Sequence, residues 1–375
     1  MGSLQGNDVL KLIYIESIIM KKLDSRKVYL SNTVDEYNYL IQMVRLLCAV
    51  SVIVSHAFVL GMQTNDMLGI LTNGKYNLGN LAVYILFFIS GLYSIRSLVH
   101  KKYNFTQYIK NRIKKIWLPL LFLVLISVFV LGPFFSILPI EVYFSNITTY
   151  RYLLTGLFLI QHELPGVFIN NIYPNVINGA LWTLPLELLC YISLVFVIRY
   201  DLICEKRHFI FSLCEVIIPF GISYYIFDNI EGLSRYNYHL SAVFFFYMGV
   251  CSYLYAKSIY INKRFGCVML LLCIVSTITP FSKIILFITL PYIVLCFCFS
   301  KRDNRKGVMC CLGNYSYEMY LCGFVIQQCI VQIFGGQMNP YINIILCVPL
   351  DILAGYLLYN LVNKIYSYIC LHNRG

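Results

Sequence analysis

The sequence predicts an all-α polytopic membrane protein with about ten transmembrane helices. Hydrophobic residues make up 59% of the 375 residues, charged residues only 12%, and the mean hydropathy is +0.72. Because a soluble chain is about a quarter charged, this one has too few charged side chains to cover a water-facing surface. The apolar residues also gather in long runs, and most Lys and Arg residues lie in alternate connecting segments. A soluble enzyme and a disordered scaffold are therefore excluded.

Ten apolar runs approach the length of a membrane-spanning helix, about 20 residues. The predicted spans are roughly 39–60, 79–99, 116–136, 180–199, 209–227, 238–256, 265–280, 282–300, 315–335 and 341–362. The seventh and eighth are short and are divided near Pro280. A further apolar stretch, 152–160, is too short to span. We expect it to lie in the membrane interface or to re-enter the membrane.

The Lys and Arg residues orient these spans, because cytoplasmic loops carry an excess of them. With the N-terminus in the cytoplasm, 23 of the 29 lie on the cytoplasmic side and two lie inside spans. The other side receives four: Lys75, Arg151, Arg235 and Lys283. Both termini are therefore expected in the cytoplasm. The net charge of +12 follows from this topology, which argues against a nucleic-acid-binding protein.

The chain is expected to form one domain. Residues 1–38 are polar and lack the features of a signal peptide, so they are interpreted as a cytoplasmic N-terminal segment. Residues 39–362 form the transmembrane domain, and 363–375 form a cytoplasmic tail. The 15 cysteines are scattered through apolar runs without zinc-site spacing. They predict neither a metal site nor a disulfide framework.

The first span carries two ionisable side chains, Arg45 and His56. Eleven residues make three helical turns plus about 20°, so both lie on one face, about 16 Å apart. Ionisable groups inside a membrane are costly and indicate function. The pair thus offers a cation in the inner half and a titratable base in the outer half. The alternative is that Arg45 extends to the inner interface while His56 forms a hydrogen bond at the outer one.

The fourth span supplies a carboxylate, Glu187, which lies roughly 10 Å below the outer surface and level with His56. A buried carboxylate needs a partner. A pair with His56 would fix the imidazole tautomer and raise its basicity. A salt bridge with Arg45 is the competing interpretation.

Three other segments carry weaker signals. The segment 101–115 holds six basic residues and no acid. It either binds a phosphate-bearing cytosolic ligand or serves topology and anionic lipids. Ser90 and Gly91 permit close helix approach or a kink in the second span. The turn-forming segment 164–171 could cover the outer mouth as a lid.

Five motifs in chain order resemble the acyltransferase-3 family of bacterial integral-membrane acyltransferases, which mostly O-acetylate cell-surface glycans. They span about residues 40 to 335, most of the chain. The matching segments are Arg45-x10-His56, Phe87-Phe88-Ile89-Ser90-Gly91, the basic stretch Asn111 to Ile116 with Pro119, the block from Leu164 through Asn178, Trp182 and Glu187, and Tyr315 to Leu321. Two positions depart from the family pattern. Cys322 and Gly323 stand where many members carry His, and Ala180 stands where Ser is common.

The resemblance implies acetyl-CoA as acyl donor, without a metal, and a sugar hydroxyl as acceptor. His56 would be the general base, with Glu187 and Arg45 as its catalytic partners. Arg112, Lys114 and Lys115 would bind the phosphates of the donor. Structural or substrate-lining positions would be Ser90, Gly91, Asn178, Trp182 and Tyr317.

The expected acceptor is a lipid-linked or polymeric surface polysaccharide, such as O-antigen or capsule, in a multi-pass protein of the bacterial inner membrane. Membrane lipids are the other expected partner, and nucleic acid is not one. Direct transfer and an acetyl-His intermediate both remain open, as do the sugar, the membrane face of transfer and the oligomeric state. The alternative function is a flippase or polymerase of lipid-linked oligosaccharides. A flippase or polymerase would not require the basic segment, the Arg–His pair and the carboxylate together.

Overall fold

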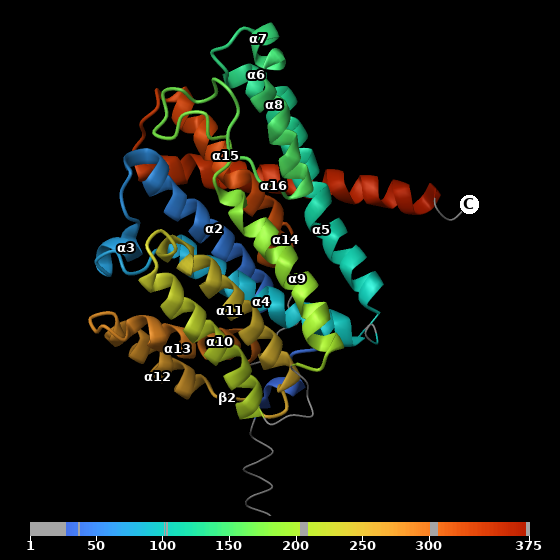
Figure 1. Cartoon of the computed structure of the whole chain (residues 1–375), viewed down its shortest axis with the longest axis vertical. Coiled ribbons are helices and arrows are strands. Elements are labelled where there is room, and N and C mark those ends of the chain that lie inside the picture. The colour runs from blue at the N-terminus through green and yellow to red at the C-terminus, as the bar shows by residue number, and fades with distance from the viewer. Residues whose placement is uncertain are drawn as a thin grey trace, which may run out of the picture.

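The computed structural model describes residues 28–36, 38–100, 102, 104–202, 209–300 and 307–372. These residues form a bundle of helices, as predicted (Figure 1). In the described part of the chain the one sheet is a short antiparallel pair. In it, β1 (Val28–Tyr29) pairs with β2 (Tyr260–Ile261), with Val28 opposite Ile261. This confirms the all-α fold class.

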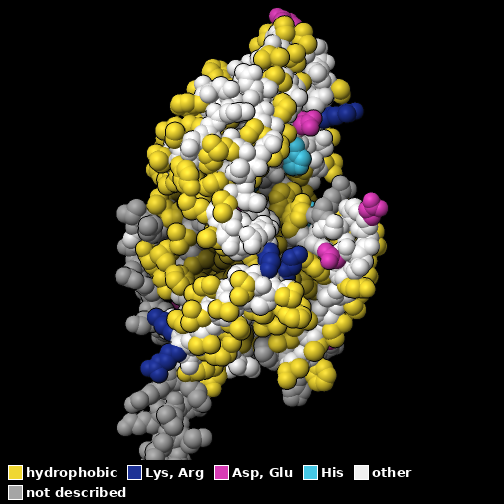
Figure 2. All heavy atoms as spheres, turned by 90° about the vertical axis from the view of Figure 1, so that its left-hand side faces the viewer, with side chains coloured by type: hydrophobic (Ala, Val, Ile, Leu, Met, Phe, Trp, Pro, Cys, Tyr) yellow, Lys and Arg dark blue, Asp and Glu magenta, His cyan; other side chains and the backbone are white. Residues whose placement is uncertain are grey.

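Seven helices in the described ranges are long and apolar enough to cross a membrane. They are α2 (Tyr39–Met62), α4 (Leu78–His100), α5 (Phe105–Ile126) with its extension, α9 (Thr183–Arg199), α10 (Phe209–Asn229), α13 (Ser282–Phe299) and α16 (Pro340–His372). The three other predicted spans are also helices: α11 (Asn237–Leu254), α12 (Lys263–Ser276) and α15 (Ser316–Ile333). The surface is mostly hydrophobic on the face in Figure 2, as expected for a protein solvated by lipid.

From Phe105 on, the basic segment before the third span is helical rather than a loop, which corrects the sequence interpretation. The side chain of Asn104 accepts a hydrogen bond from the backbone N–H of Gln107 at 3.0 Å, and so caps a helix that begins at Phe105. The helix continues through a π-helical turn, η2 (Ser127–Leu131), into α6 (Gly132–Phe135). Basic residues such as Arg112, Lys114 and Lys115 therefore point in different directions from α5 and have different neighbours.

Helix α16 is also longer than predicted and continues through His372, so residues 363–372 of the expected tail are helical. No glycine or proline interrupts that stretch. The C-terminal part of α16 projects from the bundle beyond α5 (Figure 1).

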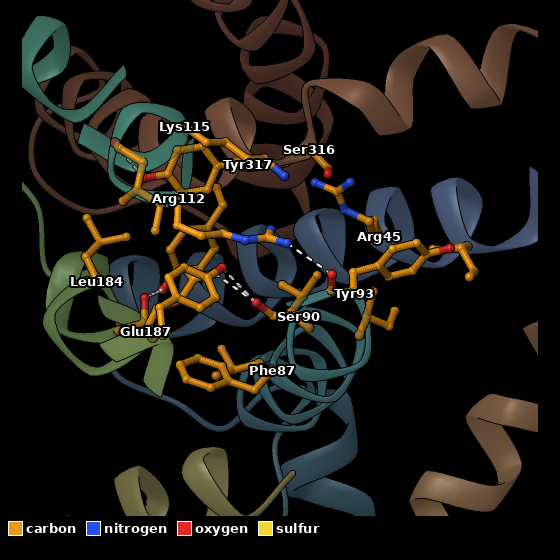
Figure 3. Close-up of a pocket in the computed structure, with 18 of the residues that line it drawn as sticks. Arg45, Phe87, Ser90, Tyr93, Arg112, Lys115, Leu184, Glu187, Ser316 and Tyr317 are labelled. Carbon is orange, nitrogen blue, oxygen red and sulfur yellow. Dashed lines mark hydrogen bonds between the residues drawn. The ribbon is translucent and has the colours of Figure 1, made fainter. Parts of the chain in front are cut away.

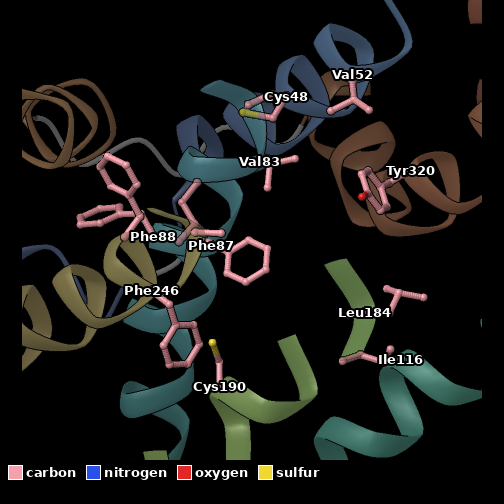
Figure 4. Close-up of a cluster of buried hydrophobic side chains, with 14 of the residues drawn as sticks. Cys48, Val52, Val83, Phe87, Phe88, Ile116, Leu184, Cys190, Phe246 and Tyr320 are labelled. Atoms are coloured by element: carbon pink, nitrogen blue, oxygen red, sulfur yellow. The ribbon is translucent and has the colours of Figure 1, made fainter. Parts of the chain in front are cut away.

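Two glycines allow α4 and α11 to pack backbone against backbone. A Cβ atom at Gly91 would lie 1.9 Å from the carbonyl oxygen of Phe246, and one at Gly249 would lie 2.1 Å from that of Phe88. No larger side chain fits without separating the helices, so the close approach suggested by the Ser-Gly pair is confirmed. Buried aromatic side chains from α4 and α11 fill the core around this contact (Figure 4).

The short apolar stretch near 152–160 forms a 3-10 helix, η3 (Tyr152–Leu157), against α5. The Trp117 indole donates a 2.8 Å hydrogen bond to the carbonyl of Gly156. In the turn-forming segment that follows, Leu164, Val167 and Phe168 are fully buried. The segment therefore packs against the bundle as part of the core.

Candidate active site

A cavity of about 280 Å³ opens between five helices, namely α2, α4, α5, α9 and α15 (Figure 3). Three of the five contribute at helical spacing: Ile41 and Arg45 on α2, Arg112 and Ile116 on α5, and Thr183 and Glu187 on α9. The remaining lining residues are Gln42, Val83, Leu86, Phe87, Ile89, Ser90, Tyr93, Lys115, Leu184, Tyr191, Ser316, Tyr317 and Tyr320. Each helix thus turns one face toward the same space.

The cavity is positively charged. Its lining contains three cations, Arg45, Arg112 and Lys115, and one carboxylate, Glu187. Figure 3 shows the basic ends of the three cations directed toward one another from α2 and α5. Like charges repel in a low-dielectric surrounding, so this arrangement favours an anionic ligand that lies between them.

Arg112 is held by three tyrosines. Its guanidinium donates a 3.0 Å hydrogen bond to the carbonyl of Tyr93. It also lies 5.4 Å from the ring centres of both Tyr108 and Tyr191, within the range of cation–π contacts. A guanidinium has five N–H donors, so several remain for a ligand after this orientation is set.

Lys114 lies outside the cavity, in contrast to the other two predicted phosphate ligands. One residue along a helix turns the side chain by about 100°. Lys114 consequently points away from Lys115, and its amine lies 5.4 Å from the ring centre of Tyr366 on α16. The sequence could not make this distinction, because it placed the three residues in a loop.

Glu187 is bound by hydroxyl groups. Its carboxylate accepts a 3.1 Å hydrogen bond from Ser90 and a short one from Tyr191, and Ser90 and Tyr191 lie 2.8 Å apart. Among the described residues, neither of its expected partners, His56 and Arg45, forms a hydrogen bond or ion pair with it. Tyr191 is a partner on the same helix, because it follows Glu187 by one helical turn, whereas Ser90 reaches Glu187 from α4.

His56 lies beyond one end of the cavity. Its ring packs edge-on against Phe324, with ring centres 5.2 Å apart. Phe324 is one turn along α15 from Tyr320, which lines the cavity. The ring of Phe324 also lies within 3.0 Å of the position a Cβ atom would take at Gly179, one turn before Thr183. Helix α15 and the segment 179–183 therefore connect the cavity with the ring that packs on the imidazole.

The remaining predicted positions divide into two groups. Ser90 and Tyr317 line the cavity, and the Tyr317 hydroxyl donates to the carbonyl of Ile116 at 3.1 Å, which joins α15 to α5. The other group supports the structure. Asn178 donates to the carbonyl of Leu321 at 2.9 Å, Gly91 makes the contact with α11, and Trp182 packs on Tyr238.

Sequence reasoning missed Tyr191, Thr183 and Tyr320. Tyr320 donates a 2.7 Å hydrogen bond to the carbonyl of Ala180, so the 2.8 Å contact between Thr183 and Tyr320 uses the Thr183 proton. Helical spacing from Glu187 could have indicated Tyr191. Nothing in the sequence brings Tyr320 to Thr183, because they lie on different helices. No cluster of three or more His, Cys, Asp or Glu side chains in the described ranges could hold a metal ion.

Comparison with known proteins agrees with this architecture. A family model described as an acyltransferase domain matches residues 38–360. The chain is also similar to a protein named O-acetyl transferase from Shigella phage Sf6, with 27% identity over 329 residues, which cover 85% of this chain and 93% of that protein. No solved structure matches the chain. The family match covers most of the sequence, and the chain therefore belongs to the acyltransferase-3 family of membrane acyltransferases.

Proposed function

We propose that the protein is an O-acetyltransferase that moves an acetyl group from acetyl-CoA to a sugar hydroxyl of a bacterial surface glycan. The observation that carries the proposal is a cavity with three convergent cations in a chain of an acyltransferase family. His56 packs against Phe324, one turn along α15 from the cavity residue Tyr320. The name of the phage relative supports acetyl as the acyl group. The multi-pass fold of the present chain suits the bacterial inner membrane, where both acetyl-CoA and glycan precursors are within reach.

The cationic cavity is the proposed donor site. Acetyl-CoA carries phosphates, and Arg45 and Arg112 can contact them in bidentate fashion while Lys115 acts as a point charge. Arg112 is oriented by its tyrosines before the ligand arrives, which lowers the entropy lost on binding. The acetyl thioester would then lie toward Thr183 and Tyr320, at the His56 end.

His56 is the proposed general base. Its imidazole takes the proton of the sugar hydroxyl while the sugar oxygen bonds to the thioester carbonyl carbon. The carbon–sulfur bond then breaks, and the imidazolium returns the proton to the departing CoA thiolate. General-base catalysis contributes about 10²–10⁴-fold to the rate. An intermediate with the acetyl group on His56 is the alternative route.

Glu187 supports this chemistry through its charge. Because its hydrogen bonds go to Ser90 and Tyr191, we assign it a field effect on the imidazolium rather than a direct bond. Its negative charge also separates the donor phosphates from the reacting end of the cavity.

The experiment that tests the function is NMR of the surface polysaccharide of the host, with the gene intact and deleted. We expect deletion to remove one acetyl ester while the glycan chain length is unchanged. An unchanged acetyl pattern with shortened or missing chains would instead support a flippase or polymerase. A second measurement separates the same alternatives, because CoA should raise the melting temperature of the purified acyltransferase and not that of a flippase.

A further inference from the structure

A second polar cavity, of about 220 Å³, lies at the same end of the bundle as His56. It is formed by the N-terminal ends of α4, α11 and α13 and the C-terminal end of α10. Gly79, between the lining residues Asn77 and Asn80, approaches α2, because a Cβ atom there would lie 3.0 Å from the Ser55 hydroxyl. Ser55 directly precedes His56, so this cavity lies beside the turn of α2 that carries the proposed base.

The second cavity also adjoins the donor site. Its lining residue Tyr238 packs edge-on against Trp182, with ring centres 4.8 Å apart. Trp182 directly precedes Thr183, which lines the donor cavity. The segment formed by Trp182 and Thr183 therefore separates the two cavities, and both lie near the turn of α2 that carries His56.

The lining of the second cavity suits a sugar. It contains four tyrosines and three asparagines: Tyr76, Tyr84, Tyr224, Tyr238, Asn77, Asn80 and Asn237. Asparagine both donates and accepts hydrogen bonds, as sugar hydroxyls require. Tyrosine combines an apolar ring with a polar tip, which matches the C–H face and the hydroxyl edge of a pyranose.

The cavity is also positively charged. Lys75 and Lys283 are the charged residues in its lining. Lys75 donates to the backbone carbonyls of Thr277 and Thr279 at 2.6 and 3.2 Å, and Lys283 donates to the Tyr224 hydroxyl at 3.0 Å. Within the described residues, neither ammonium has a salt bridge to a carboxylate. The nearest carboxylate, Asp228, accepts a 2.9 Å hydrogen bond from the lining residue Asn237 and acts on Lys283 only through its charge. The two exposed ammonium groups therefore leave the cavity with a net positive charge, which suits a phosphate better than a neutral sugar.

An apolar groove of about 540 Å³ continues from the polar cavity along α10, α11 and α13. Phe287 lines both spaces, and Phe220 in the groove lies one turn from Tyr224 in the cavity. The groove is bounded by Ile284 and Ile288 of α13, which are 59% and 65% exposed. These side chains face the surrounding lipid, so a hydrocarbon chain can enter the groove from the bilayer.

We propose that the polar cavity and the apolar groove together bind a glycan linked to a polyprenyl phosphate or pyrophosphate. The proposal rests on the acetyl-transfer function and names its acceptor. The prenyl chain occupies the groove, the phosphate lies between Lys75 and Lys283, and the first sugars contact the tyrosines and asparagines. A finished, lipid-free polymer would need neither the groove nor the two ammonium groups.

Binding is tested on the purified full-length protein by ligand-dependent shifts in melting temperature. The probes are a long-chain polyprenyl phosphate, the matching polyprenol, phosphatidylglycerol and CoA. We expect stabilisation by polyprenyl phosphate at concentrations at least about tenfold lower than by polyprenol, because a charge-assisted hydrogen bond is lost with the phosphate. Equal stabilisation by phosphatidylglycerol would mean an ordinary lipid site and would overturn the proposal.

Two pairs of variants locate the probe. Replacing both cavity lysines with methionine should weaken polyprenyl phosphate binding at least about tenfold, whereas Lys263→Met, on an exposed residue of α12, should not change it. Gly221→Phe should fill the groove, since a Cβ atom at Gly221 meets no atom within 4 Å. Ile222→Phe, at the next position and outside the groove lining, is its control. Unchanged binding in both groove and lysine variants would place the ligand elsewhere.

The CoA probe separates this proposal from the function on which it rests. Stabilisation by CoA without stabilisation by polyprenyl phosphate would refute the lipid-linked acceptor and leave the acetyltransferase standing. Absence of both would refute the acetyltransferase.

Discussion

Arg112 shows how a single residue would make the proposed donor cavity selective for anions. Its guanidinium is aligned by the Tyr93 carbonyl and by the rings of Tyr108 and Tyr191. Lysine cannot reproduce this planar arrangement. We therefore expect Arg112→Lys to raise the KM for acetyl-CoA by about tenfold or more, the loss of one charge-assisted hydrogen bond, with a smaller effect on kcat.

Lys114 provides the matched control for that measurement. It lies next to Lys115 in sequence but contacts Tyr366 outside the cavity. Steady-state kinetics of Lys114→Gln should give a KM close to that of the wild type. An equal rise in KM for both variants would mean that the basic helix acts only as a diffuse positive surface.

His56 is expected to affect the chemical step alone. His56→Gln keeps the volume and polarity of the side chain but removes the base. The transfer rate should fall by about 10²–10⁴-fold, while the melting temperature and its shift with CoA stay close to those of the wild type. A variant that transfers acetyl at the wild-type rate would remove His56 from the mechanism.

At the residue scale, the sequence indicated the ionisable side chains but not their partners. Arg45 and Glu187, which were predicted inside spans, meet in one cavity with Arg112 and Lys115, which were predicted in the cytoplasmic basic segment. Among the described residues, Glu187 and His56 form no hydrogen bond with each other. The Glu187 carboxylate instead accepts hydrogen bonds from Ser90 and Tyr191. Helical periodicity gives the face of a side chain, whereas its partner on another helix depends on packing.

Among the helices, the α4–α11 contact determines how Ser90 faces the donor cavity. Gly249→Ala would place a methyl group 2.1 Å from the Phe88 carbonyl oxygen, and overpacking of this kind costs about 1–3 kcal/mol. We expect a lower melting temperature and weaker CoA binding, because α4 also carries Tyr93, whose carbonyl positions Arg112.

The control for this prediction is Gly221→Ala on α10. A methyl group there meets no atom within 4 Å, and alanine favours a helix by about 1 kcal/mol over glycine. Its melting temperature should equal or exceed that of the wild type. Equal destabilisation by both substitutions would attribute the effect to loss of glycine rather than to the helix contact.

The boundaries of the helices were predicted less well than their existence. Hydrophobicity located every long helix, because lipid-facing side chains must be apolar. It placed the start of α5 too late, since the amphipathic basic turns from Phe105 are polar and yet helical. Asn104, a residue type that often caps helices, was the signal for a helix start at Phe105. The dense positive charge that follows it favoured the interpretation as a loop instead.

For the molecule as a whole, two cavities of different chemistry lie on opposite sides of the segment formed by Trp182 and Thr183. The donor cavity is enclosed by α2, α4, α5, α9 and α15, and the second polar cavity lies where α4, α10, α11 and α13 meet. Helix α4 contributes to both. The sequence predicted the family and drew attention to the residues of the first cavity. It did not predict the second cavity, whose residues are spread from Lys75 to Phe287 and carry no motif.

The most direct test of the central claim is transfer by the purified protein from isotopically labelled acetyl-CoA to the glycan of its host, followed by NMR of the product. We predict a labelled acetyl ester on one sugar hydroxyl, one free CoA released for each ester formed, and almost no ester with His56→Gln. Hydrolysis of acetyl-CoA without ester formation, or equal ester formation by His56→Gln, would contradict the account.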